Sequence, residues 1–282
     1  MTQSEITTEI TLETMTSLHL SDALALSVQA RWPHRHEDWA LLLGISNGWV
    51  ALEAGTVVGT AIMTPFGSTG GAINMVIVSE TMRGRGIGRR LFAATLDAAG
   101  GRRLRLTATP DGEPLYRSLG FEPYGRIFQR QGILGAVPEM AGAEDATDTD
   151  DAAIVALDKA AFGEDRSALL HMLKQAGRFA VIRRDGAVAG FACIRDFGRG
   201  KLIGPVVAAD TQDAQRLIAY LAAGQEGVFM RLDITSDTGL NDWLAGMGLP
   251  QTDDGLVMWT EPPTIPAAGA ARTMGLASQA LG

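Results

Sequence analysis

Apolar positions in the first part of the chain alternate between helical and strand-like spacing. Residues 17–30 carry apolar side chains at mainly helical spacing, and Asp22 lies near their start, where a carboxylate favours a helix N-terminus. Residues 49–52 and 57–64 are short β-branched runs separated by the turn Glu53-Ala54-Gly55-Thr56. This arrangement predicts a helix followed by a β-hairpin.

The pattern continues with elements that are closely spaced. The apolar run 73–78 predicts a buried strand, and residues 87–99 carry one apolar helical face. Residues 104–108 predict a further strand, and 114–119 a short helix that ends before Gly120. Helices that alternate with strands in this order predict an α/β or α+β fold, with a mixed sheet flanked by helices.

The second half repeats this order. Its predicted elements are a helix at 153–162, strands at 179–183 and 188–194 around the turn Arg184-Asp185-Gly186-Ala187, a strand at 201–208, a helix at 213–223, a strand at 228–234 and a short helix at 240–247 before Gly248. An internal repeat of this kind predicts two domains, at 1–131 and 152–260. The acidic stretch 132–151 is expected to be a solvated linker, and the C-terminal tail, 261–282, is expected to dock on the body.

Composition narrows the classes of function. The 282 residues are 46% apolar and carry a net charge of -8, so two ordinary cores are feasible and non-specific nucleic-acid binding is disfavoured. No apolar run is long enough to span a membrane, and the first eleven residues do not resemble a signal peptide. Cys193 is the only cysteine, lies in an apolar strand and is expected to be a core residue. A cytoplasmic protein is therefore expected.

The segment Arg83-Gly84-Arg85-Gly86-Ile87-Gly88 lies between the apolar strand 73–78 and the helix 87–99. A helix N-terminus offers free N–H groups and a partial positive charge, and glycines allow an anion to approach them closely. The glycines alone leave three alternatives open: a dinucleotide fingerprint whose third glycine comes one residue early, a Walker loop that lacks its Lys, and a turn without a ligand.

Two motifs together resemble the GNAT superfamily of N-acyltransferases. Arg83 to Gly88 fits the family's coenzyme A signature, which is Gln or Arg, two residues, Gly, one residue, and Gly or Ala. Tyr116-Arg117-Ser118-Leu119-Gly120-Phe121 fits a second motif of Tyr, three residues, Gly and Phe. The resemblance covers residues 10–130 and implies acetyl-coenzyme A as co-substrate and no metal.

The resemblance also implies residue roles. Backbone groups of Val76, Ile77 and Val78 would pair with the pantetheine arm, and Tyr116 would protonate the leaving thiolate. The turn would hold the pyrophosphate through its backbone amides and positive potential, with the residues Arg83, Gly84, Arg85, Gly86, Ile87, Gly88 and Arg89.

The general base stays open. Asn74 occupies the strand position that carries an acid in some GNAT members, and an amide cannot act as a base. The alternatives are a water relay, Glu53, Glu80 or the polar group His34, His36, Glu37 and Asp38, which could equally be surface residues.

The second half lacks both motifs. Ala208 to Asp213 replaces the glycine turn, Asp210 and Asp213 would repel phosphate, and Leu244 stands where Tyr116 would be. It resembles the degenerate domain of bacterial tandem GNAT proteins. The expected function is N-acetyl transfer (EC 2.3.1.-) to a small-molecule or peptide amine, by a monomer or homodimer. A non-catalytic acyl-coenzyme A sensor and a dinucleotide oxidoreductase remain the rival classes.

Overall fold

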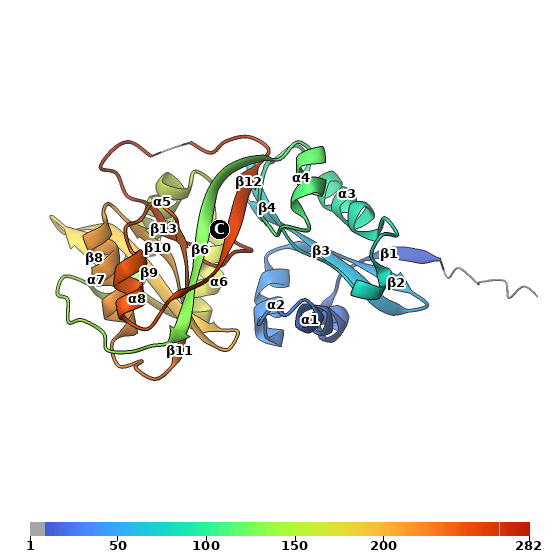
Figure 1. The fold of residues 1–282 in the computed structure, drawn as a ribbon. Helices are drawn as coiled ribbons and strands as arrows, with labels where there is room; N and C mark the ends of the chain where they lie inside the picture. The colour runs from blue at the N-terminus through green and yellow to red at the C-terminus, as the bar shows by residue number, and fades with distance from the viewer. Residues whose placement is uncertain (1–8, 265) are drawn as a thin grey trace, which may run out of the picture. The chain divides into compact units, whose positions relative to one another are not determined.

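A computed structural model describes residues 9–264 and 266–282 of the chain. Most of residues 1–11, in which no signal peptide is expected, lies outside these ranges. The chain divides into two compact units (Figure 1). The first comprises the described residues up to Thr64 together with Ile73–Gly101, and the second comprises Pro65–Ala72 and Arg102–Gly282. Within the described ranges, no helix is both long and apolar enough to cross a membrane.

In its described residues, the first unit contains strands in the order β1-β2-β3-β4 and the helices α1, α2 and α3. Its elements are β1 (Ile10–Thr14), α1 (Leu20–Gln29), α2 (His36–Gly44), β2 (Asn47–Glu53), β3 (Thr56–Phe66), β4 (Gly70–Val78) and α3 (Ile87–Ala99), and the far ends of β3 and β4 group with the other unit. The predicted hairpin is confirmed, because β2 and β3 pair antiparallel around Ala54 and Gly55. Both turn residues have positive φ, 49° and 80°, which suits the twist of the two strands.

Helix α3 has the predicted bounds and buries the predicted face. Ile87 and Leu91 pack into a cluster with Ala51 and Val58 of the hairpin, and Gly100 ends the helix with a left-handed φ of 59°. Helix α2 was not predicted, because its polar start resembles a loop. Trp39 of α2 is fully buried and donates its indole N–H to Ser27 Oγ of α1 at 2.9 Å, which joins the two helices.

The second unit contains the rest of the chain. Its elements are β5 (Arg103–Ala108), α4 (Glu113–Ser118), β6 (Glu122–Ile133), β7 (Glu144–Asp145), α5 (Asp151–Phe162), α6 (Ser167–Ala176), β8 (Gly177–Arg184), β9 (Ala187–Phe197), β10 (Gly200–Ala208), α7 (Thr211–Ala222), β11 (Phe229–Thr235), α8 (Asn241–Gly246), β12 (Gln251–Trp259) and β13 (Arg272–Gly275). The series from β7 to β12 repeats the series from β1 to β6 element by element. The predicted internal repeat is therefore confirmed, and it includes strands and helices that the sequence pattern had not shown.

The two repeats exchange their last strands. Strand β12 of the second repeat pairs antiparallel with β5 of the first, from Leu256↔Ala108 to Trp259↔Arg105. Strand β6 of the first repeat lies between β12 and β11, and it pairs antiparallel with both (Figure 1). Each repeat thus has its sheet completed by a strand of the other repeat, and β5 would have an open edge without β12.

Helices cover both faces of the second repeat's sheet. Helix α7 packs its apolar face, with Leu217, Ile218 and Leu221, against one set of alternating strand residues that includes Ala192 and Ile194. Phe179 and Val181 alternate with that set and point to the opposite face, where α5 and α6 lie. Helix α6, which was not predicted, buries Leu169, Leu170 and Leu173.

The last residues of the sequence add a strand to this sheet. Strand β13 pairs antiparallel with β10 over Val206–Ala208, and Leu276 donates its N–H to Asp233 O of β11 at 2.7 Å. It lies between β10 and β11, which also pair directly at Lys201–Leu202 and Met230–Arg231. Met274, Leu276, Ala277 and Leu281 are buried.

The acidic stretch before α5 has more order than the sequence predicted for a solvated linker. Glu144 and Asp145 form β7 against β8, and Asp145 pairs with Arg178 at 2.8 Å. Arg183 binds Asp150 at 2.9 Å, and this hydrogen bond, together with the Thr147 amide, holds the pKa of Asp150 well below its usual range. These carboxylates are close together in the sequence, but they pair with the distant residues Arg178 and Arg183. The periodicity of the sequence cannot show such pairs.

Met258→Ala in β12 tests the strand exchange. Met258 is fully buried between Leu106 of β5 and Pro123 of β6. The substitution should lower the free energy of unfolding by about 2–5 kcal/mol and speed amide hydrogen exchange in β5. Gln251→Ala, at an exposed position of the same strand, should change neither. Unchanged exchange in β5 after Met258→Ala would contradict the role of β12.

Candidate active site

The turn before α3 leaves the helix N-terminus open. Gly84 and Gly86 have left-handed φ angles of 78° and 75°, and Gly86 is the N-cap of α3. A Cβ added to either glycine would meet no protein atom within 4 Å. Glycine is therefore required here by the backbone conformation, and it leaves the space above the turn clear of side chains.

Several amides of this turn precede the hydrogen bonds of the helix. The bond from Arg90 N to Gly86 O, at 3.1 Å, is the first of the α-helical series, so the amides of Ile87, Gly88 and Arg89 lie before it. No side chain caps them. Gly88 is half-buried beside Val78, whereas the side chain of Ile87 is in the core.

Arginines surround the turn. Arg83, Arg85 and Arg89 are exposed, and they add positive potential to the partial charge of the helix end. Arg85 is also held by Glu53 of the hairpin, at 2.7 Å. Glu53, one of the residues considered as a general base, is thus an ion-pair partner of the turn.

Strand β4 is distorted just before Val76, Ile77 and Val78. Met75 has a φ of 50°, which is strained for a residue that is not glycine. The buried Thr60 hydroxyl donates to Met75 O at 2.7 Å and supports this conformation. Val76 and Val78 are half-buried, and all three residues follow the segment Gly70–Ala72 that pairs with β5.

Asn74 belongs to a buried polar network. Its amide Nδ2 donates to Thr64 Oγ1 at 3.0 Å, and Thr64 is 2.7 Å from Ser46 Oγ. The network ties β4 to β3 and to the residue before β2. Asn74 thus has a structural role where some GNAT members carry an acid.

Tyr116 lies on α4 in the second compact unit, whereas the α3 turn belongs to the first. Its side chain is buried, and its ring lies 6.4 Å from that of the fully buried Phe121. Burial raises the pKa of Tyr116 to about 12, because the phenolate would lose its hydration. The phenol therefore keeps its proton at neutral pH, as a general acid must.

The polar group around residue 36 starts a helix. Arg35 is the N-cap of α2, and its backbone N–H donates to Asp38 Oδ2 at 2.9 Å. The Arg35 side chain also pairs with Asp38 at 3.1 Å, so this carboxylate is occupied by a cap and an ion pair. The ring of His34 lies 6.0 Å from that of Trp32 and 6.4 Å from that of Trp39, and His36 and Glu37 are exposed.

The corresponding helix start in the second repeat is closed. Asp210 is the N-cap of α7, and its side chain accepts the N–H of Asp213 at 2.8 Å. A carboxylate thus occupies the place where the first repeat has an open glycine. Leu244 is fully buried in the core. Cys193 is also buried, which raises the pKa of its thiol to about 12 and supports its predicted place in the core.

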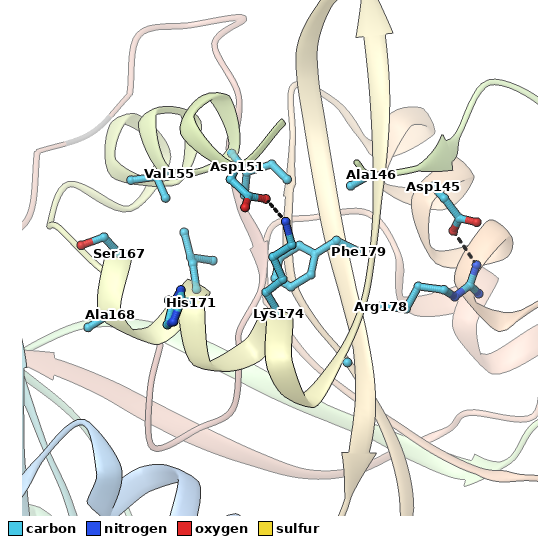
Figure 2. A pocket seen from close by; sticks show the side chains of 13 residues that line it. Asp145, Ala146, Asp151, Val155, Ser167, Ala168, His171, Lys174, Arg178 and Phe179 are labelled. Atoms are coloured by element: carbon cyan, nitrogen blue, oxygen red, sulfur yellow. Dashed lines mark hydrogen bonds and ion pairs between the residues drawn. The ribbon is translucent and has the colours of Figure 1, made fainter. Parts of the chain in front are cut away.

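A half-open pocket of about 780 Å³ lies in the second repeat, where sequence reasoning had placed no site (Figure 2). Its walls come from α5, α6 and the start of β8, with Ile154, Leu170 and Phe179 among the apolar residues. Lys174 is paired with Asp151, and Arg178 with Asp145 (Figure 2). Lys174 and Arg178 of the lining thus each have a carboxylate partner.

Comparisons with known proteins agree with this fold. Residues 45–123 and residues 154–269 each match a family described as acetyltransferase (GNAT) domain. The chain is also 31% identical over 275 residues to the uncharacterized N-acetyltransferase YitH of Bacillus subtilis (strain 168), and the match covers 94% of this chain and 95% of that relative. The chain therefore belongs to the GNAT family of N-acetyltransferases, with two tandem GNAT folds.

Solved structures share the fold over nearly the whole chain. A putative acetyltransferase from Pyrococcus horikoshii has a TM-score of 0.81 at 17% identity, and the match covers 100% of this chain and 99% of that one. A tandem GNAT protein from the clavulanic acid biosynthesis pathway has a TM-score of 0.64 at 18% identity, over 91% of this chain and 100% of its own. At these identities the likeness concerns the fold alone.

Thr60→Val tests the support of the strained strand. The change removes the hydroxyl that donates to Met75 O, in a buried place that water does not reach. The free energy of unfolding, measured in urea, should fall by about 1–3 kcal/mol. Thr60→Ser keeps the hydroxyl and should lose less. Equal losses in the two variants would show that the hydrogen bond does not stabilise the distorted strand.

Proposed function

We propose that this protein transfers an acyl group, most directly acetyl, from acetyl-coenzyme A to a primary amine by direct attack in a ternary complex. The observation that carries the proposal is the open, left-handed glycine turn at the start of α3. Family membership supports acyl transfer in general, and the turn supports coenzyme A as the carrier. The acceptor is a small-molecule or peptide amine, and the expected location is the cytoplasm.

In the proposal, backbone groups of the first unit bind the co-substrate. The amides from Gly84 to Arg89 receive the pyrophosphate, because three of them precede the helical hydrogen bonds and Gly84 and Gly86 leave the approach clear. Arg83 and Arg89 add charge that attracts the anion. Backbone groups of Val76, Ile77 and Val78 pair with the pantetheine arm, and a strand N–H receives the developing oxyanion.

Tyr116 is proposed as the general acid. The amine nitrogen attacks the thioester carbonyl carbon, the C–S bond of the resulting adduct breaks, and the leaving sulfur takes the proton of the Tyr116 phenol. The amine gives up its own proton to water, and the tyrosinate takes a proton back from solvent, so that no net proton is gained or lost. Tyr116, whose pKa is raised by burial to about 12, is protonated at the start of each cycle, as an ordinary phenol also is at neutral pH.

The second repeat is proposed to bind no acyl-coenzyme A. Two observations support this. Asp210 caps the helix start that would meet the pyrophosphate, and a carboxylate there repels phosphate. Strand β13 pairs with both β10 and β11, so backbone groups of those strands are already bonded. One site per chain is therefore expected.

Gly86→Glu should abolish binding of acetyl-coenzyme A. The side chain enters the open space above the turn and places a negative charge beside the pyrophosphate. Isothermal titration calorimetry should give one site for the natural chain and a loss of affinity of about 100-fold or more in the variant, which is about 3 kcal/mol. Gly224→Glu is the matched control, because Gly224 also has a left-handed φ, 74°, and an open Cβ position. Unchanged affinity in Gly86→Glu would exclude this turn as the cradle.

Tyr116→Phe should lower turnover and leave binding intact, because only the proton donor is removed. Thiol release from acetyl-coenzyme A would be followed with a panel of amines: spermidine, tyramine, glucosamine and a short peptide. A fall in kcat of about 100-fold or more is expected, at an unchanged Kd for acetyl-coenzyme A. Full activity of the variant would remove Tyr116 from the mechanism. Tight binding without turnover of any amine by the natural chain would favour the acyl-coenzyme A sensor instead.

A further inference from the structure

Gly112 is the N-cap of α4, the helix that carries Tyr116. Its φ and ψ angles are -87° and -26°, in the right-handed region that any residue adopts. Side-chain N-caps such as Asp or Ser would also stabilise this helix better than glycine. Neither backbone conformation nor capping therefore explains a glycine at this position.

A close approach of Tyr116 does explain it. A Cβ on Gly112 would lie 2.7 Å from Cε2 of Tyr116 and 3.0 Å from both Cζ and the phenol oxygen. The geometry follows from the helix, because side chains lean toward the N-terminus and cover the residue four positions earlier. The hydroxyl end of the ring thus rests directly on the bare Cα of Gly112.

Phe121 limits the ring from another direction. The two ring centroids are 6.4 Å apart at an interplanar angle of 59°, and Phe121 is fully buried. The Phe121 N–H also donates to Tyr116 O at 3.1 Å, which fixes the following turn to the helix. A methyl added at Gly112 would therefore have to move the Tyr116 ring relative to this neighbour.

The second repeat provides an internal comparison. Helix α8 is the counterpart of α4, and it has Leu240 at the N-cap and Leu244 four residues later. The backbone bond from Leu244 N to Leu240 O, at 2.9 Å, matches the bond from Tyr116 N to Gly112 O, at 3.2 Å. The same helix start therefore accepts a large side chain where no phenol rests on it, so the glycine accompanies the tyrosine.

We propose that Gly112 is a positioning residue, whose missing side chain holds the Tyr116 hydroxyl where it delivers its proton to the leaving sulfur. The inference rests on the proposed function, in which Tyr116 is the general acid. Gly112 touches no reacting atom and acts only through the position of the phenol. Gly112 lies outside both sequence motifs, and the proposal explains why a glycine is found there.

Gly112→Ala tests the proposal. The added methyl should displace the phenol and lower kcat by about 10- to 100-fold, with the fastest amine of the panel above. The KM for acetyl-coenzyme A and the Tm should change little, because only the end of one side chain has to move. In the Tyr116→Phe background, Gly112→Ala should cause no further loss of kcat, since no proton donor is left to misplace.

A second measurement needs neither an amine nor turnover. The chain has three tyrosines, so ring-¹³C-labelled tyrosine gives a simple NMR spectrum, in which Tyr116 is assigned by its absence from Tyr116→Phe. The Tyr116 signal should shift in Gly112→Ala. Gly246→Ala is the matched control, because Gly246 lies in α8 and a Cβ there meets no atom within 4 Å.

The outcomes distinguish failure of the proposed acid, Tyr116, from failure of the positioning role of Gly112. Full activity of Tyr116→Phe would contradict the proposed acid, and with it the purpose assigned to Gly112. A large loss in Tyr116→Phe together with unchanged kcat in Gly112→Ala would overturn the positioning role and leave the acid in place. An additional loss of kcat when Gly112→Ala is combined with Tyr116→Phe would also overturn it, because the glycine would then act by another route. An unmoved Tyr116 signal would contradict the steric argument itself.

Discussion

The exchange of β6 and β12 is the constraint on which the rest of the second unit depends. Strand β5 of the first repeat is completed by β12 of the second, and β11 of the second is completed by β6 of the first. Backbone N–H and C=O groups along a strand need partners, and on one side of β5 and of β11 these partners come from a strand of the other repeat. Tyr116 lies between β5 and β6 in the chain, and the scaffold of the proposed acid therefore includes the repeat that lacks both GNAT motifs. This gives the second repeat a structural purpose that does not require a ligand.

The two repeats also differ at the helix start where the first repeat is proposed to bind an anion. Both have a strand that leads into a helix, and both helix starts carry the same partial positive charge. The first leaves it open with Gly84 and Gly86, whereas the second satisfies it internally with Asp210. Strand β13 then bonds to β10 and β11, which leaves less free backbone in the second repeat. The difference lies in a few residues at one turn and in the path of the last segment.

Two unusual local features lie where the proposed chemistry is located. Met75 is held in a strained conformation by Thr60, and the Tyr116 ring rests on a glycine whose dihedral angles are ordinary. Only the first of these is a backbone distortion; the second is a close contact, which is proposed to position a hydroxyl. In each case a neighbour fixes the geometry: a buried hydrogen bond for the strand, and a steric limit for the ring.

The sequence by itself determined the elements around the two motifs and the tandem order. Strand β4, helix α3 and helix α4 follow from local signals: an apolar run, an amphipathic period, and glycines at helix ends. It also led to the family through Arg83 to Gly88 and Tyr116 to Phe121. Tertiary structure alone decided the strand exchange, the ion pairs of the acidic stretch, the place of β13 and the contact of Gly112 with Tyr116. The physical reason is that period and turn chemistry act over a few residues, whereas strand partners, ion pairs and ring contacts depend on which distant segments the packed chain brings together.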